Sequence, residues 1–478
     1  MLFNSIEFLI FLPIVFLLYW YAFRRLQWQN LLVVCASYLF YGWWDWRFLL
    51  LITFTALTSY LSGILIENDR SKSKGHGRWY LTANLVINLL ILGIYKYYDF
   101  FVGSLSEALN HIGFHTTFTS LGLVLPVGIS FYTFQALSYS IDVYKEKIRP
   151  THNPIEFFAF ISFFPQLVAG PIERATHLLP QFQKPRTFDY KAAVDGTRQI
   201  LWGLFKKMVI ADNCALIVND VFDHYQEVSS VTLAYGAFMF AFQIYGDFSG
   251  YSDIAIGTAR LFGIHLKRNF NYPYFSRSIP EFWRRWHISL NTWFVDYIYI
   301  PLGGSRCRRW KVLRNTFIVF LLSGLWHGAN WTFICWGLFH GLLFLPYLLS
   351  GKDTHFTEDV AANGSLPSLK ESLQIIVTFI LVTTGWIVFR TETLMDACRY
   401  LKHMLTGFDF QMPEIDYITL SFIVILVVTE WIHRKKQFGL QIDDHQWHPA
   451  FRYALYVILA FTIMLFAGKS AQFIYFQF

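Results

Sequence analysis

Apolar segments follow one another along almost the whole chain, and they limit the folds open to it more than any other feature. They occupy roughly residues 5–23, 29–44, 47–66, 79–97, 121–143, 154–169, 196–218, 231–246, 315–349, 372–389, 417–433 and 449–468. A helix needs about 20 apolar residues to cross a bilayer, and shorter or interrupted runs are tolerated only inside protein or beside water. The pattern predicts an all-α polytopic membrane protein of about eleven transmembrane helices with additional re-entrant and interfacial helices.

Composition supports this class, because 55% of the 478 residues are hydrophobic and only 15% are charged. A soluble chain carries about 25% charged residues. The longer polar stretches, 171–194 and 351–371, are too short to fold alone. We therefore predict one integral membrane domain over residues 1–478, with a catalytic core at approximately residues 120–345, where polar side chains gather in apolar surroundings.

The positive charges indicate how the chain crosses the membrane. Clusters at 24–25, 70–78 and 145–149 fall in alternate loops, whereas residues 99–120 contain neither Lys nor Arg. Because basic loops stay in the cytoplasm, we expect the N-terminus on the opposite side of the membrane, and membrane lipids, not nucleic acid, as partners of these charges. The first apolar run lacks a leading positive charge and a cleavage site, which favours a retained span over a signal peptide.

The sequence SGLWHGANW places a histidine, His327, inside the apolar run 315–349. An ionisable group at membrane depth is costly, so it marks a functional site by default. A buried imidazole stays neutral, which is the form that a general base needs to take a hydroxyl proton. On a continuous helix Ser323, His327 and Trp331 share one face, with Asn330 beside them. The alternative is a histidine that only joins two helices.

A second histidine, His287, lies in the sequence PEFWRRWHISLNTW. If this segment is one helix, Arg284, His287 and Asn291 form a polar stripe, and Glu281 can pair with Arg285. The two arginines could hold a phosphorylated donor such as coenzyme A. The alternative is an interfacial helix whose arginines meet lipid headgroups.

Two carboxylates, Asp247 and Asp253, lie in a third polar segment, YGDFSGYSDIAIG. They could orient a histidine, although structural pairing with a cation such as Arg260 or Arg284 is the stronger hypothesis. The basic run 306–314 can anchor lipid headgroups or dock an anionic donor. No metal site is predicted, because no ligand cluster has recognisable spacing. The five cysteines are scattered without CxxC spacing, at Cys35, Cys214, Cys307, Cys335 and Cys398.

Three stretches carry a resemblance to a known family: YGDFSGYSDIAIG, NYPYFSRSIPEFWRRWHISLNTWFVDYIYIPLGG and RNTFIVFLLSGLWHGANWTFICWGLFHG. They resemble the core of the membrane-bound O-acyltransferases, above all the bacterial branch that O-acetylates polysaccharides. The resemblance extends over nearly the whole chain, including its opening and its ending FIYFQF. It implies that His327 is the catalytic histidine of the family and that His287 is its second histidine.

The resemblance also implies a fold and a reaction. The fold would be a ring of tilted helices around a central tunnel. The acetyl group would come from the cytoplasm, from acetyl-coenzyme A (acetyl-CoA), with no permanently bound cofactor. A periplasmic or extracellular partner acetyltransferase, together with polysaccharide export machinery, would complete transfer to an alginate-like polymer.

Three other functions stay open at this point. The same fold could O-acetylate peptidoglycan or D-alanylate teichoic acid. A proton-coupled polysaccharide transporter is an alternative of another class, because intramembrane histidines and aspartates can also form a proton relay.

Overall fold

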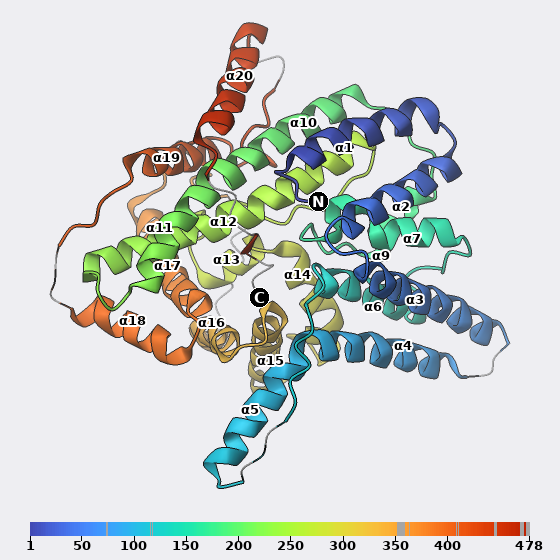
Figure 1. Cartoon of the computed structure of the whole chain (residues 1–478), viewed down its shortest axis with the longest axis horizontal. Coiled ribbons are helices and arrows are strands. Elements are labelled where there is room, and N and C mark those ends of the chain that lie inside the picture. Colours follow the sequence, from blue (N-terminus) through green and yellow to red (C-terminus); the bar gives the residue numbers. More distant parts are fainter. Residues whose placement is uncertain are drawn as a thin grey trace. The chain divides into compact units, whose positions relative to one another are not determined.

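The computed structural model describes residues 1–72, 75–114, 116, 118–350, 359–362, 364–407, 409, 411–443, 447–468 and 473–474. Within these ranges the regular structure is helical and contains no strand (Figure 1). The chain divides into two compact units: unit 1 is Met1–Ala193 with Thr258–Lys267, and unit 2 is Val194–Gly257 with Arg268–Phe478. That the whole chain acts as one domain stays a prediction.

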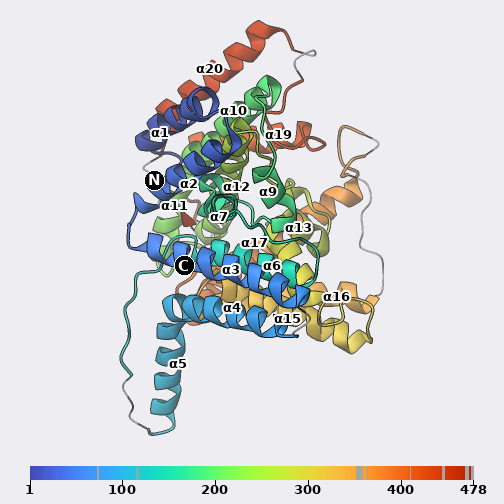
Figure 2. The ribbon, with the colours of Figure 1, turned by 90° about the vertical axis from the view of Figure 1, so that its right-hand side faces the viewer.

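Unit 1 contains the helices of the N-terminal part of the chain. They are α1 (Ile6–Leu17), η1 (Leu18–Ala22), α2 (Leu26–Gly42), α3 (Phe48–Ser71), α4 (Gly77–Leu92), η2 (Gly93–Tyr97), α5 (Tyr98–His111), α6 (Ile129–Tyr144), α7 (Pro154–Ser162), α8 (Phe164–Leu167) and α9 (Ala175–Phe182). Helices α3, α4 and α6 pack side by side (Figure 2). Asn84 joins them, since its Nδ2 donates to Ser140 Oγ at 2.8 Å and its Oδ1 accepts from Ser59 Oγ at 3.3 Å. Such polar contacts hold helices together where burial of apolar surface gives no driving force.

Unit 2 contains most of the helices that follow. They are α10 (Tyr190–Leu204, beginning in unit 1), η3 (Phe205–Ala211), α11 (Asp212–Asp223), α12 (Ser230–Leu261, ending in unit 1), η4 (Pro273–Phe275), α13 (Ile279–Arg285), α14 (Ile288–Phe294), η5 (Val295–Tyr299), α15 (Arg309–His327), α16 (Trp331–Ser350), α17 (Leu369–Arg390), α18 (Leu394–Thr406), α19 (Tyr417–Ile432) and α20 (Pro449–Phe466). Every residue that the sequence singled out as a candidate for chemistry belongs to unit 2.

Five helical segments of the described chain are long and apolar enough to cross a membrane. They are Phe48–Ser71, Gly77–His111, Trp331–Ser350, Leu369–Arg390 and Pro449–Phe466, and two shorter apolar helices are Ile6–Ala22 and Tyr417–Ile432. These segments support the predicted multi-pass helical membrane protein. The predicted number of about eleven spans is larger than the number of these segments and stays a prediction.

The apolar run 315–349 was expected as one segment but contains two helices, α15 and α16, which lie side by side (Figure 1). The chain turns at Gly328, whose backbone is extended, and Asn330 Oδ1 then accepts from Thr332 N at 3.1 Å to cap α16. A Cβ added at Gly324 would lie 2.2 Å from the carbonyl oxygen of Phe333. The two backbones are therefore in contact, which only a residue without a side chain permits.

Candidate active site

His327 is the last residue of α15, and its ring lies among aromatic side chains. The ring meets those of Trp326, Trp336 and Phe389 edge to face, with centroid distances of 5.0, 5.1 and 5.4 Å. Only 4% of the residue is exposed. Trp336 comes from α16 and Phe389 from α17, so the packing of three helices fixes the orientation of this imidazole.

His287 lies between α13 and α14 and has a left-handed backbone, with φ of 44°. Such a conformation costs a residue other than glycine about 1–3 kcal/mol and persists where the surroundings enforce it. The residue is 1% exposed, and the ring of Phe248 from α12 meets its imidazole edge to face at 4.6 Å. A strained, buried histidine of this kind is typical of a functional site.

The structure brings the two histidines together. Their ring centroids are 6.4 Å apart, and the indole of Trp326 lies 5.6 Å from His287 and 5.0 Å from His327. A small reacting group held between the two rings would therefore contact both imidazoles. The sequence alone could not establish this proximity, because forty residues separate the two histidines.

The predicted polar stripe of Arg284, His287 and Asn291 is wrong, because the segment is not one helix. Helix α13 ends at Arg285, and the left-handed turn at His287 redirects the chain into α14. Asn291 Nδ2 donates to the carbonyl oxygen of Trp286 at 2.8 Å and also to that of Trp283. Asn291 therefore satisfies the end of α13, and Arg284 is exposed.

The predicted face of Ser323, His327 and Trp331 is also interrupted. Ser323 is buried one turn before His327 in α15, as expected. Trp331 begins α16 beyond the turn and is 51% exposed, while Asn330 Nδ2 donates to the carbonyl oxygen of Glu392 at 2.8 Å. Of the three supporting residues, only Ser323 stays on the helix face of His327.

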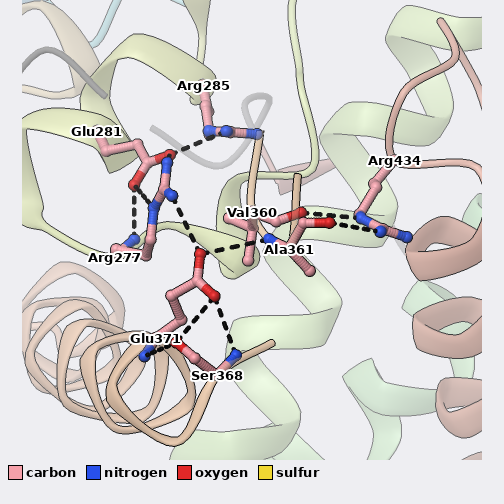
Figure 3. Close-up of polar contacts among 8 residues, drawn as sticks. All are labelled: Arg277, Glu281, Arg285, Val360, Ala361, Ser368, Glu371 and Arg434. Atoms are coloured by element: carbon pink, nitrogen blue, oxygen red, sulfur yellow. Dashed lines mark hydrogen bonds and ion pairs between the residues drawn. The ribbon is translucent and has the colours of Figure 1, made fainter. Parts of the chain in front are cut away.

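A buried carboxylate, Glu281, clamps the helix that precedes His287 (Figure 3). Its Oε1 accepts from Arg277 Nη2 at 3.0 Å and from Arg285 Nη2 at 2.9 Å, while its Oε2 accepts from the backbone N of Arg277 at 2.8 Å. The predicted Glu281–Arg285 pair is therefore confirmed. This pair engages the guanidinium of Arg285, one of the two arginines suggested for donor phosphates.

The clamp continues to the start of α17 (Figure 3). Arg277 Nη1 donates to Glu371 Oε1 at 3.3 Å, and Glu371 forms a reciprocal capping pair with Ser368. The backbone N of Ala361 donates to the same Glu371 oxygen at 3.3 Å, and the carbonyl oxygen of Ala361 accepts from Arg434 Nη2 at 3.2 Å. Elements from four parts of unit 2 thus brace the helix that leads to His287.

The two aspartates of α12 form ion pairs with lysines of η3, and the Asp247 pair is buried. Asp247 Oδ1 lies 2.7 Å from Lys207 Nζ, and Asp253 Oδ2 lies 2.6 Å from Lys206 Nζ. Lys207 also pairs with Asp212 at 2.8 Å. The predicted pairing of these aspartates with cations is confirmed, and the partners that the structure shows are lysines rather than the suggested arginines.

These two lysines were missed in the sequence, although the signal was present. Lys206 and Lys207 are adjacent in an apolar run, and a cation at that depth needs a partner. They lie in a π-helical turn, a feature that is frequent at functional sites. Phe248, which contacts His287, directly follows Asp247 in α12, so the ion pairs support the wall behind that histidine.

Comparison with known proteins identifies the family of the chain. The family described as "MBOAT, membrane-bound O-acyltransferase family" matches residues 34–363, and the chain belongs to it. The sequence is 40% identical over 422 residues to the "Probable alginate O-acetylase" of Pseudomonas aeruginosa, covering 88% of this chain and 78% of that protein. It is 33% identical to the "Peptidoglycan O-acetyltransferase" of Helicobacter pylori, covering 100% and 98%, and 31% identical to the "Teichoic acid D-alanyltransferase" of Bacillus subtilis, covering 56% and 69%. The protein is an O-acyltransferase.

Proposed function

We propose that this chain takes acetyl from acetyl-CoA on the cytoplasmic side of the bacterial inner membrane and delivers it for O-acetylation of an exported, alginate-like polysaccharide. One observation carries the proposal. Two buried histidines lie 6.4 Å apart in a chain that is 40% identical to probable alginate O-acetylases over 88% of its length.

In the proposed reaction, His327 takes the proton of an acceptor hydroxyl, and the hydroxyl oxygen attacks the thioester carbonyl carbon. The carbon–sulfur bond breaks as the new ester bond forms, and the leaving thiolate receives the proton from His327. His287 donates a hydrogen bond to the carbonyl oxygen as negative charge develops on it. General-base assistance and stabilisation of developing charge are the two contributions expected of such a pair.

A tunnel through a ring of helices fits this reaction, because only a small acetyl group has to pass between the two sides. Neither coenzyme A nor the polymer then crosses lipid, where their charges would be costly. A periplasmic or extracellular partner acetyltransferase and the export machinery would receive the acetyl group, and the N-terminus would lie outside.

Polysaccharide acetate in cells tests the proposal. A deletion strain should lose ester-linked acetate from its exported polysaccharide, the wild-type gene should restore it, and the His327→Ala variant should not. Immunoblotting of membrane fractions controls for equal amounts of the two proteins. Unchanged polysaccharide acetate in the deletion strain, with no second copy of the gene present, contradicts the proposal.

Peptidoglycan O-acetylation is the second candidate. It is favoured by the alignment with the Helicobacter pylori protein, which covers 98% of that relative, whereas the alginate relatives are covered over 78–84% of their length. Acetate measured separately in purified cell wall and in exported polysaccharide distinguishes the two substrates. Loss from the cell wall alone moves the assignment to peptidoglycan.

A further inference from the structure

The turn that contains His287 lies along a short segment, residues 269–271. The backbone N of Asn271 donates to the carbonyl oxygen of Arg285 at 2.9 Å, and the backbone N of Ile288 donates to that of Asn269 at 2.9 Å. These two bonds flank the histidine on both sides. The segment therefore acts as a template for the backbone that enters and leaves His287.

The side chain of Asn269 adds a second pair of contacts after the turn. Its Oδ1 accepts from Ser289 N at 3.2 Å and from Ser289 Oγ at 2.9 Å. A backbone N–H can only donate, so the atom that faces Ser289 must be the amide oxygen. Asn269 is fully buried, and the bonds to its backbone carbonyl oxygen and to its Oδ1 hold the first turn of α14 in place.

The chemistry of the position explains why an amide stands there. The Nδ2 atom of Asn269 has no hydrogen-bond partner among the described residues, and the side chain lines a small cavity that Lys206, Asp253 and Glu430 also line. An aspartate would keep the oxygen that Ser289 needs but would bring a third carboxylate to that cavity. Asparagine supplies the acceptor without the charge.

We propose that Asn269 is a positioning residue for His287, an inference that rests on the proposed acyl transfer. The backbone of His287 is left-handed, a conformation that persists only where neighbouring contacts enforce it. Asn269 enforces it from the α14 side, and Asn291 does so from the α13 side. Without Asn269 Oδ1, the first turn of α14 is released, His287 relaxes towards negative φ, and its ring moves relative to that of His327.

The test compares two buried asparagines in purified protein reconstituted into vesicles with acetyl-CoA and an oligosaccharide acceptor. Asn269→Ala should lower kcat by about a hundredfold and leave the KM for acetyl-CoA nearly unchanged, because a small misplacement of a reacting group costs rate rather than binding. Asn315→Ala is the matched control, since Asn315 is equally buried and donates to the carbonyl oxygen of Leu302, and it lies in α15 twelve residues before His327. It should keep kcat within about twofold.

Thermal unfolding of both variants separates positioning from general stability. The proposal would be overturned if Asn269→Ala and Asn315→Ala lost kcat equally and in proportion to their loss of thermal stability. It would also be overturned if Asn269→Ala kept the wild-type kcat. If Asn269→Ala does not fold, Ser289→Ala removes the contact between Ser289 Oγ and Asn269 Oδ1, keeps the bond from Ser289 N, and should lower kcat about three- to tenfold. An unchanged kcat in Ser289→Ala would overturn the proposal. A wild-type protein without acyl transfer activity would instead refute the proposed function.

Discussion

His287 and His327 lie side by side, but the molecule holds them by different means. His327 is the last residue of a regular helix, and the rings of Trp336 and Phe389 orient its imidazole. His287 sits in a left-handed turn whose flanking peptide groups are bonded to Asn269 and Asn291. The position of His327 therefore depends on the packing of neighbouring rings, whereas that of His287 depends on hydrogen bonds to the adjoining backbone. Substitutions near His327 should act through packing, and those near His287 through lost hydrogen bonds.

The largest effect is expected from substitution of His327, whose ring is oriented by packing. His327→Ala should lower the rate of acetyl transfer by about 10²–10⁴-fold, because the general base is lost. The matched control is His340→Phe, since His340 is also fully buried in an aromatic environment, with its ring 4.9 Å from Trp283 and 5.1 Å from Trp336. It should stay within about tenfold of wild type, because the replacement keeps an aromatic ring in the site and leaves His287 and His327 unchanged.

Rates per folded protein, measured in vesicles, decide this prediction. If His340→Phe abolishes transfer while His327→Ala does not, the catalytic histidine has been assigned to the wrong helix.

The next effect concerns the ion pairs of Lys207, which adjoin Phe248, the side chain packed against His287. Lys207→Met leaves Asp247 and Asp212 buried without their cation, which should destabilise the fold by about 3–5 kcal/mol. Lys311→Met, at an exposed lysine of α15, should change stability by less than about 0.5 kcal/mol. Thermal unfolding in detergent compares the two variants. Equal unfolding temperatures would show that the ion pairs do not support this side of the site.

A smaller effect tests the packing on the His327 side. Gly324→Ala places a Cβ 2.2 Å from the carbonyl oxygen of Phe333, so α15 and α16 must separate, at about 1–3 kcal/mol. In Gly341→Ala, the nearest atoms belong to the ring of Phe317 at 3.1 Å, which can turn aside. Only Gly324→Ala should therefore slow transfer and lower the unfolding temperature. Two indistinguishable variants would contradict control of His327 by helix approach.

The smallest effect reports on the backbone of His287. Asparagine adopts a left-handed conformation readily and a β-branched residue does not, so His287→Asn should be more stable than His287→Val by about 1–2 kcal/mol. Both variants lack the imidazole, so stability alone is the readout. Equal unfolding temperatures would mean that the left-handed turn is not enforced in the folded protein.

Hydropathy was sufficient to predict most of the helices, because continuous apolar runs such as those of α3, α17 and α20 have few alternatives in a membrane protein. The two histidines could also be found, since an imidazole in an apolar run is conspicuous. The sequence did not predict the break at Gly328 or the turn at His287. The turn depends on hydrogen bonds that Asn269 accepts and that Asn291 donates, and periodicity carries no information about such contacts.

The lysine partners of the α12 aspartates escaped prediction for a related reason. Lys207 and Asp247 are forty residues apart and meet only because η3 packs against α12. Glu281 and Arg285 were predicted as a pair, because four residues along a helix is a local relation. Local geometry was therefore accessible from the sequence, whereas the partners of buried charges required the fold.

Acyl transfer within the membrane is proposed to depend on the neighbouring imidazoles of His287 and His327. The most direct measurement follows acetyl-labelled coenzyme A supplied to one side of vesicles that contain the purified protein. We predict release of free coenzyme A and appearance of labelled acetyl ester on an acceptor, both lost in His327→Ala. Movement of a solute across the vesicle membrane without cleavage of the thioester, or undiminished cleavage in His327→Ala, would contradict the account.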